Sequence, residues 1–166
     1  MNTVKAIGEL LIGRGIVYGG RDLEGDTFTK ETDLGKRRDF NGMPVFYDHG
    51  LGGLKSQVGH VTSWREDDEG IEFAIELEKR HQYADVVLRL AQEGALGLST
   101  GALGHLVERK GGYIKRWIVG EVSLTPTPAE PRTIAQPAAE AKAVQADAPE
   151  DAQSRIPTIT IIRGTQ

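Results

Sequence analysis

The chain has 166 residues, a formal net charge of -4 and no cysteine. This length is enough for one domain with a substantial core, and the missing cysteine excludes both a disulfide framework and a thiol nucleophile. The acidic balance and the lack of a dense Lys/Arg face argue against a nucleic-acid partner, and no apolar run approaches the roughly 18 residues of a membrane span, so we expect a soluble, cytosolic protein without a membrane partner.

Strands dominate the elements predicted for the first part of the chain. The segment "VKAIGELLIGRGIVYGG" (4–20) is typical of a strand whose glycines mark bulges or close approaches. The basic cluster "GKRRDF" (35–40) is interpreted as a solvated loop. A short apolar strand at 44–47 then delivers Asp48 and His49 to its end, where glycines follow.

The clearest pattern along the chain is the alternation in "GIEFAIELE" (70–78). Its acidic residues are expected to face one side of the strand. Its apolar residues are expected to face the other side, and they are Ile71, Phe73, Ile75 and Leu77. With "VGHVTSW" (58–64) and the acidic turn "REDDEG" between them, this segment predicts a hairpin. A helix is predicted over 82–93, with Gly94 as its C-terminal cap.

The second part of the chain predicts another hairpin and then a change of composition. Residues 102–109 are expected to pair with 113–124 through Lys110, Gly111 and Gly112. The predicted fold is mainly β with external helices (α+β), built as a small closed or partly open antiparallel β-barrel.

The predicted barrel domain covers residues 1–136. The segment 137–154 is rich in Ala, Pro and acidic residues and is expected to be a flexible linker. The strand-like tail at 155–166 either pairs back onto the sheet or docks on another protein.

The segment "GALGLSTGAL" (94–103) places one serine among glycines and small apolar residues. Gly97 and Gly101 remove side chains on either side of Ser99, which would let a substrate approach its hydroxyl. A serine hydroxyl is a weak nucleophile unless an adjacent base accepts its proton, so Ser99 needs a histidine as its partner.

The four histidines differ in their suitability for that role. His49 lies at a strand end beside a glycine-rich loop, a position suited to catalysis. His60 lies inside the predicted hairpin and suits a structural role, and His81 is expected to be solvated at the helix start. His105 is expected to share a strand with Ser99 at an even spacing, several residues away.

Metal ligation is the competing use of histidine, and Glu121 is a further candidate group. Asp48 and His49 are adjacent, but the chain has neither H-x-x-x-H nor H-E-x-x-H spacing, and no phosphate-binding G-x-x-x-x-G-K-[ST] loop. We therefore predict no metal and no cofactor.

In "GEVSLTPTPAEP" (120–131), Glu121 is either a structural carboxylate or a group that orients a histidine.

Five segments occur in an order that resembles the prohead (capsid maturation) proteases of tailed phages. They are "LIGRGIVYGGRDLEGDTF", "MPVFYDHG", "VGHVTSWREDDEGIEF", "GALGLSTGAL" and "GEVSLTPTPAEP", within residues 5–135. The resemblance implies a fold similar to that of herpesvirus assemblins, a small β-barrel surrounded by helices that carries a serine protease site.

The resemblance also implies roles for individual residues. Ser99 matches the nucleophile of the family and His49 its general base. Assemblins use a second histidine as the third member, but this chain has no histidine after His105, so Glu121 is assigned the orienting role, with Asp48 as the alternative. Oxyanion donors are expected near Gly101 or in the 126–132 loop, with Arg132 as an assisting group.

The function implied by the resemblance is a serine endopeptidase of prohead maturation. Its expected substrates are the scaffold protein, the major capsid protein and the protease itself, inside the assembling prohead in the host cytoplasm, with a homodimer as a further expected partner state. Two alternatives stay open: a catalytically inactive capsid-assembly or scaffold component on the same fold, and a β-barrel peptide-binding module.

Overall fold

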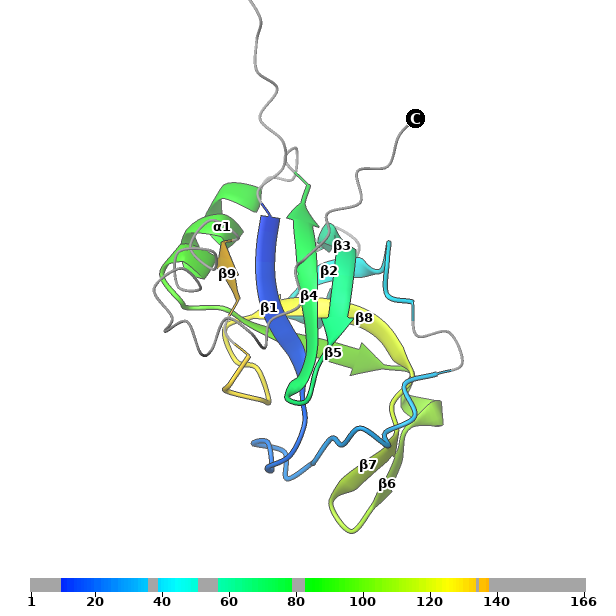
Figure 1. The fold of residues 1–166 in the computed structure, drawn as a ribbon. Helices are drawn as coiled ribbons and strands as arrows, with labels where there is room; N and C mark the ends of the chain where they lie inside the picture. The colour runs from blue at the N-terminus through cyan, green and yellow to red at the C-terminus, as the bar shows by residue number, and fades with distance from the viewer. Residues whose placement is uncertain (1–9, 36–38, 51–56, 79–82, 134, 138–166) are drawn as a thin grey trace, which may run out of the picture.

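The computed structural model describes residues 10–35, 39–50, 57–78, 83–133 and 135–137. Seven strands form one sheet in the order β5-β8-β2-β3-β4-β1-β9, and β6 and β7 form a separate two-stranded hairpin (Figure 1). The strands are β1 Leu10–Val17, β2 Pro44–Tyr47, β3 Gln57–Glu66, β4 Gly70–Leu77, β5 Gly97–Ala102, β6 Glu108–Lys110, β7 Tyr113–Arg116, β8 Val119–Thr125 and β9 Gln136–Pro137. The helix is α1 Ala84–Gln92, and two 3-10 turns are η1 Asp48–Gly50 and η3 Gly104–Leu106.

The large sheet curls into a nearly closed barrel, as predicted. Its two sides meet where β1 contacts β5, and the chain after β8 helps to close the gap. The backbone of Leu98 in β5 donates to the carbonyl of Thr133 at 2.7 Å, and Ala135 donates to Leu96 at 3.0 Å. The next residue, Gln136, begins β9, which pairs with β1, so this segment joins the two sides of the barrel.

The hairpin of β3 and β4 confirms the alternating pattern. Its four apolar residues on β4 are buried, each at most 4 % exposed: Ile71, Phe73, Ile75 and Leu77. In β1 the register shifts between Arg14 and Ile16, which confirms a bulge at a glycine. A Cβ at Gly15 would lie 2.6 Å from the ring of Phe73, so this glycine also allows a close approach.

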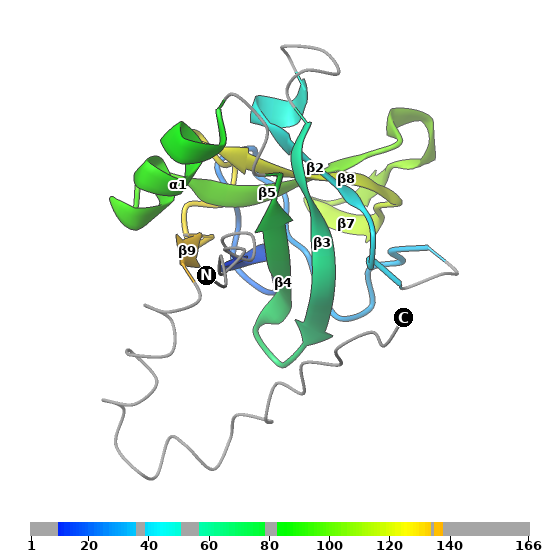
Figure 2. The ribbon, with the colours of Figure 1, turned by 90° about the horizontal axis from the view of Figure 1, so that it is seen from above.

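Helix α1 lies on the outside of the barrel beside β9 (Figure 2). It buries Val87 and Ala91 and starts two residues later than predicted. Gly94 has a φ of 66° and its N–H donates to the carbonyl of Ala91, which confirms the predicted cap. Among the described residues, no helix is long and apolar enough to cross a bilayer.

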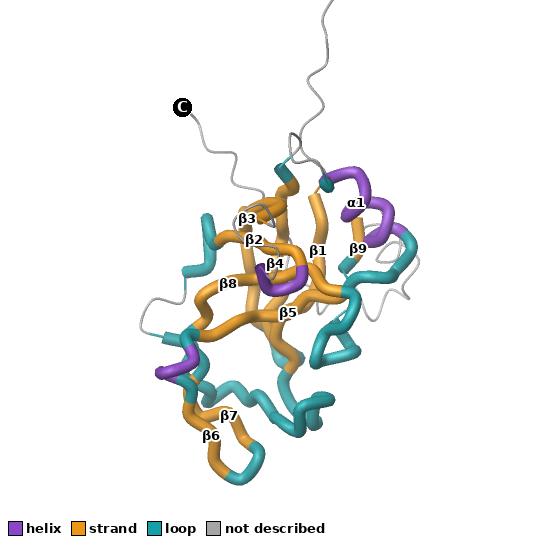
Figure 3. Tube along the Cα trace, turned by 180° about the vertical axis from the view of Figure 1, so that it is seen from behind, coloured by secondary structure: helices purple, strands orange, loops and turns teal. Residues whose placement is uncertain are grey.

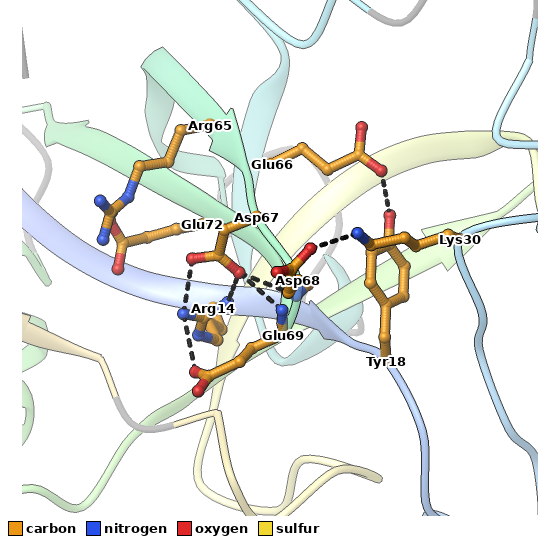
Figure 4. A network of polar contacts seen from close by, with 10 residues as sticks. Arg14, Tyr18, Lys30, Arg65, Glu66, Asp67, Asp68, Glu69 and Glu72 are labelled. Atoms are coloured by element: carbon orange, nitrogen blue, oxygen red, sulfur yellow. Dashed lines mark hydrogen bonds and ion pairs between the residues drawn. The ribbon is translucent and has the colours of Figure 1, made fainter. Parts of the chain in front are cut away.

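The acidic turn between β3 and β4 is fastened to β1 by an ion-pair cluster (Figure 4). The guanidinium of Arg14 donates to both carboxylate oxygens of Asp67, at 2.6 and 2.8 Å. Asp67 also accepts the backbone N–H groups of Glu69 and Gly70. The Arg14 guanidinium is the main reason that the pKa of Asp67 is lowered to about 2.

Three predictions about local structure need correction. Residues 102–109 are not one strand, because β5 ends at Ala102 and η3 follows, so His105 does not share a strand with Ser99. The hairpin at Gly111 and Gly112 exists, but it belongs to the small sheet of β6 and β7, while β8 pairs with β5. Phe40 is the last residue of the segment predicted as a solvated loop, yet its side chain is 2 % exposed and packs on Phe73 in the core.

One pairing departs from the antiparallel pattern that we expected throughout. Strands β2 and β8 run parallel, with Phe46 opposite Ser123 and Tyr47 opposite Leu124. The residues that follow β2, in η1, therefore lie beside β8 (Figure 3). The predicted linker beyond Pro137 and the tail lie outside the described residues, as do Lys36, Arg37, Arg38 and His81.

Candidate active site

His49 is held in an unusual backbone conformation at the end of β2. Asp48 and His49 have φ angles of 47° and 56°, in the left-handed region that non-glycine residues rarely adopt. Two side chains of β8 hold this turn: the hydroxyl of Ser123 accepts the N–H of His49 at 3.0 Å, and Thr125 donates to the carboxylate of Asp48 at 2.9 Å. Strained backbone of this kind persists only where its surroundings determine it.

The ring of His49 contacts the carboxylate of Glu121. Nδ1 of His49 lies 2.6 Å from Oε1 of Glu121, and the two side chains are 39 % and 18 % exposed. Because an ionised carboxylate only accepts hydrogen bonds, Nδ1 carries the proton and Nε2 is left as the basic nitrogen. The hydrogen bond from Glu121 raises the pKa of His49; burial opposes this, and the charges of Glu121, Asp48 and Glu24 add to it.

Ser99 lies in the middle of β5, directly opposite Ser123 of β8. Opposed residues of an antiparallel pair put their side chains on the same face, with Cβ atoms about 4.5–5.5 Å apart. Glu121 is two residues from Ser123 on β8 and therefore lies on that face as well. The register thus brings Ser99 next to the pair formed by His49 and Glu121.

Ser99 and His49 both line a cavity of about 860 Å³. It is lined by the segment from Gly94 to Gly101, by the loop that follows β1 and by the loop that follows β8. These loops are joined by the N–H of Leu23, which donates to the carbonyl of Ala129 at 2.8 Å. The cavity is therefore lined along the segment from Gly94 to Gly101, which includes the part of β5 that carries the serine.

The two glycines that flank Ser99 have close neighbours within the chain, in addition to the clearance for a substrate that stays a prediction. A Cβ at Gly97 would lie 2.6 Å from Cγ of Pro128, and a Cβ at Gly101 would lie 2.8 Å from Cδ of Glu121 and overlap its Oε1. Both glycines thus make room for groups of the chain itself, and both also line the cavity. Gly101 in particular allows the carboxylate of Glu121 to reach His49.

Of the two carboxylates considered as orienting groups, Glu121 contacts the ring of His49, whereas the carboxylate of Asp48 accepts from Thr125. Arg132 is not among the described residues that line the cavity. Its guanidinium donates to both oxygens of Glu130 and to the carbonyl of Gly19, at 2.6–2.8 Å. The oxyanion roles of Arg132 and Gly101 stay predictions.

The other histidines that the structure describes lie outside the cavity. Nε2 of His60 lies 3.8 Å from Glu76 on the neighbouring strand, which agrees with a structural role. His105 is exposed in η3. Within the described part of the chain, no three His, Cys, Asp or Glu side chains are grouped so that they could hold a metal ion.

Two residues of the site were not identified from the sequence. Ser123 joins His49 to Glu121, and strand alternation from Glu121 would have placed it on the same face. Trp117 lines the cavity, with its indole N–H donating to Thr100 at 3.1 Å and its ring packed edge-on against Phe28. A tryptophan two residues before a strand carries no sequence signal that would separate it from a core residue.

Comparison with known proteins found no matching family model, and no curated protein matches the chain. Among solved structures, a Kaposi's sarcoma herpesvirus protease in complex with an allosteric inhibitor is similar with a TM-score of 0.53 and 14 % identity, over 86 % of this chain and 82 % of that chain. The same viral protease in complex with a hexapeptide phosphonate inhibitor gives 0.54 and 14 %, over 88 % and 73 %. A third structure, at room temperature, gives 0.52 and 13 %, over 89 % and 86 %. The chain therefore has the fold of the herpesvirus proteases.

Proposed function

We propose that the protein is a serine endopeptidase that cleaves scaffold and capsid proteins, and itself, during phage prohead maturation. The observation that carries the proposal is the 2.6 Å contact between Nδ1 of His49 and Glu121, together with the cavity that His49 and Ser99 both line. The fold supports a protease, and the order of the sequence segments supports the phage context.

In the proposed reaction, Nε2 of His49 accepts the proton of the Ser99 hydroxyl as its oxygen attacks a peptide carbonyl carbon. The resulting imidazolium is stabilised by the carboxylate of Glu121 and then gives its proton to the leaving amine. Water hydrolyses the acyl-enzyme in the same way, with His49 again as the base. The tetrahedral intermediates need N–H donors, which contribute roughly 10²–10³ in rate; Gly101 and the 126–132 loop are the candidates.

A carboxylate is a chemically suitable third member of this site. Glu121 is mostly buried and accepts through both oxygens, Oε1 from His49 and Oε2 from Ser123. A charge-assisted hydrogen bond is roughly twice as strong as one between neutral groups. Glu121 therefore fixes the ring and raises its basicity more than a neutral imidazole would.

The proposal is tested with an active-site-directed phosphonate. A fluorophosphonate should label the wild-type protein once, at Ser99, and mass spectrometry should locate the adduct. Ser99→Ala should abolish the labelling, and Ser63→Ala, at an exposed serine of β3, should leave it unchanged. His49→Ala and Glu121→Gln should slow the labelling.

Coexpression with the capsid and scaffold proteins tests the biological substrate. Cleavage fragments are expected with the wild-type protein and should be absent with Ser99→Ala. Labelling without capsid cleavage would retain the peptidase and reject the prohead role. Absence of both labelling and cleavage would reject the proposal and favour an inactive capsid-assembly component on the same fold.

A further inference from the structure

Ser123 is a buried serine whose hydroxyl makes two hydrogen bonds within the site. It lies on β8 two residues after Glu121, and it is 0 % exposed. Its Oγ accepts the N–H of His49 at 3.0 Å and donates to Oε2 of Glu121 at 2.8 Å. A hydroxyl has a single hydrogen, so donation to Glu121 fixes the oxygen lone pairs toward the backbone of His49.

These contacts close a ring of hydrogen bonds. The ring leaves the main chain of His49, passes through the hydroxyl of Ser123 and the carboxylate of Glu121, and returns to Nδ1 of the same histidine. We infer that Ser123 is a positioning residue of the proposed peptidase, which locks the backbone of His49 and the carboxylate that orients its ring into one unit. This inference rests on the proposed function for its catalytic consequence, while the ring of contacts stands without it.

Two features of the site require such a link. The left-handed backbone at His49 needs an external partner to hold it, and Ser123 supplies an acceptor for its N–H. The carboxylate of Glu121 would turn about its terminal torsion if only one oxygen were bound, because such torsions have broad minima. With Ser123 on Oε2, the other oxygen stays directed at His49.

The same contacts separate the roles of the two opposed serines. The hydrogen of Ser123 is committed to a carboxylate and its side chain has no access to solvent, so it is unsuited to attack a substrate. Ser99 lines the cavity. The lost hydrogen bond is made to a charged carboxylate, and its removal is expected to cost about 10–100-fold in activity.

The experiment compares Ser123→Ala with Thr32→Val in the full chain. Thr32 is also a buried hydroxyl, 1 % exposed, and it donates to the carbonyl of Ile114 away from the cavity. Ser123→Ala should lower kcat about 10–100-fold with KM unchanged, because Ser123 does not line the cavity. Thr32→Val should lower thermal stability without altering either constant.

A second readout does not depend on activity. NMR titration of the His49 ring should show its midpoint falling toward the ordinary histidine value in Ser123→Ala, because the contact with Glu121 loosens. The charges of Glu121, Asp48 and Glu24 that raise this pKa are all retained in the variant. Thr32→Val should titrate like the wild type.

Should Ser123→Ala fail to fold, Ser123→Cys fills the same space with a much weaker donor and should show an intermediate loss. Wild-type kcat and an unchanged His49 midpoint in the Ser123 variants would overturn the inference. The His49 midpoint could shift in the Ser123 variants although the wild-type protein neither reacts with the fluorophosphonate nor cleaves a substrate. That result would confirm the hydrogen-bonded unit and reject the peptidase.

Discussion

The substitution Gly101→Ala is the sharpest single test of the geometry around His49. The new Cβ would lie 2.8 Å from Cδ of Glu121, whereas ordinary van der Waals contact begins near 3.4 Å, so the carboxylate carbon must move by about 0.6 Å. The oxygen that contacts His49 would overlap the methyl group and must move further. The 2.6 Å contact with Nδ1 would therefore be lost or badly distorted.

The size of the effect follows from the contact that is removed. A hydrogen bond to a charged group contributes about 1.5–3 kcal/mol, and each 1.36 kcal/mol is tenfold in rate, so kcat/KM should fall about 10–150-fold. The backbone N–H of residue 101 is retained, so loss of an oxyanion donor would not explain the change. Gly104→Ala is the matched control, because a Cβ at Gly104 meets nothing within 4 Å.

The assay combines peptide hydrolysis with NMR titration of His49. Gly101→Ala should lower both kcat/KM and the midpoint of the His49 titration, and Gly104→Ala should change neither. If Gly101→Ala kept the wild-type rate and midpoint, Glu121 would not be the group that orients His49.

Four further outcomes are expected. The pKa of His49 is raised above 6.5, and a general base must be neutral, so kcat/KM should rise with pH through a midpoint above 6.5. Glu121→Gln should lower that midpoint. A wild-type midpoint at or below 6.5 would contradict this expectation. The same contact affects the free energy of unfolding in the opposite sense. Charged His49 stabilises the fold fully below the ordinary histidine pKa, and this contribution disappears as pH rises through the raised pKa of His49. Urea unfolding should therefore show that Glu121→Gln costs less stability at high pH than at low pH. Asp67→Asn should cost about 1 kcal/mol at neutral pH after allowance for solvent screening, and the cost should vanish as pH falls from 3.8 toward the lowered pKa of about 2; a cost that persists in acid would argue against the ion pair with Arg14. Arg132→Ala should raise KM more than it lowers kcat, because Arg132 joins Glu130 to Gly19 beside the cavity, and a large loss confined to kcat would favour the oxyanion role instead.

Elements with a strong period were predictable from the sequence. The alternation of β4, the strand that ends just before Asp48 and His49, and the cap at Gly94 all depend on neighbouring residues, and the structure confirms each of them. Where the chain changes sheets, local pattern is insufficient. The two strand-like segments of 102–124, separated by Lys110, Gly111 and Gly112, predict one hairpin, but β7 and β8 belong to different sheets.

The contacts within the site needed the register of strands that are distant in sequence. His49 and Glu121 are 72 positions apart, and they meet because β2 and β8 run parallel, a pairing that no local pattern indicates. The space at Gly101 follows from its place opposite Glu121. Ser123 is a small polar residue in a strand, and its role becomes visible only when its partners are in place.

The parallel pairing of β2 with β8 has a consequence for the time at which the site can form. During translation, a nascent chain that has delivered His49 and Ser99 but not β8 lacks both Glu121 and the acceptor for the His49 N–H. Contacts between remote segments are completed late, because the intervening loop must close first. On the proposed function, no cut in the chain itself or in its neighbours is expected until the barrel is complete and the whole domain has left the ribosome.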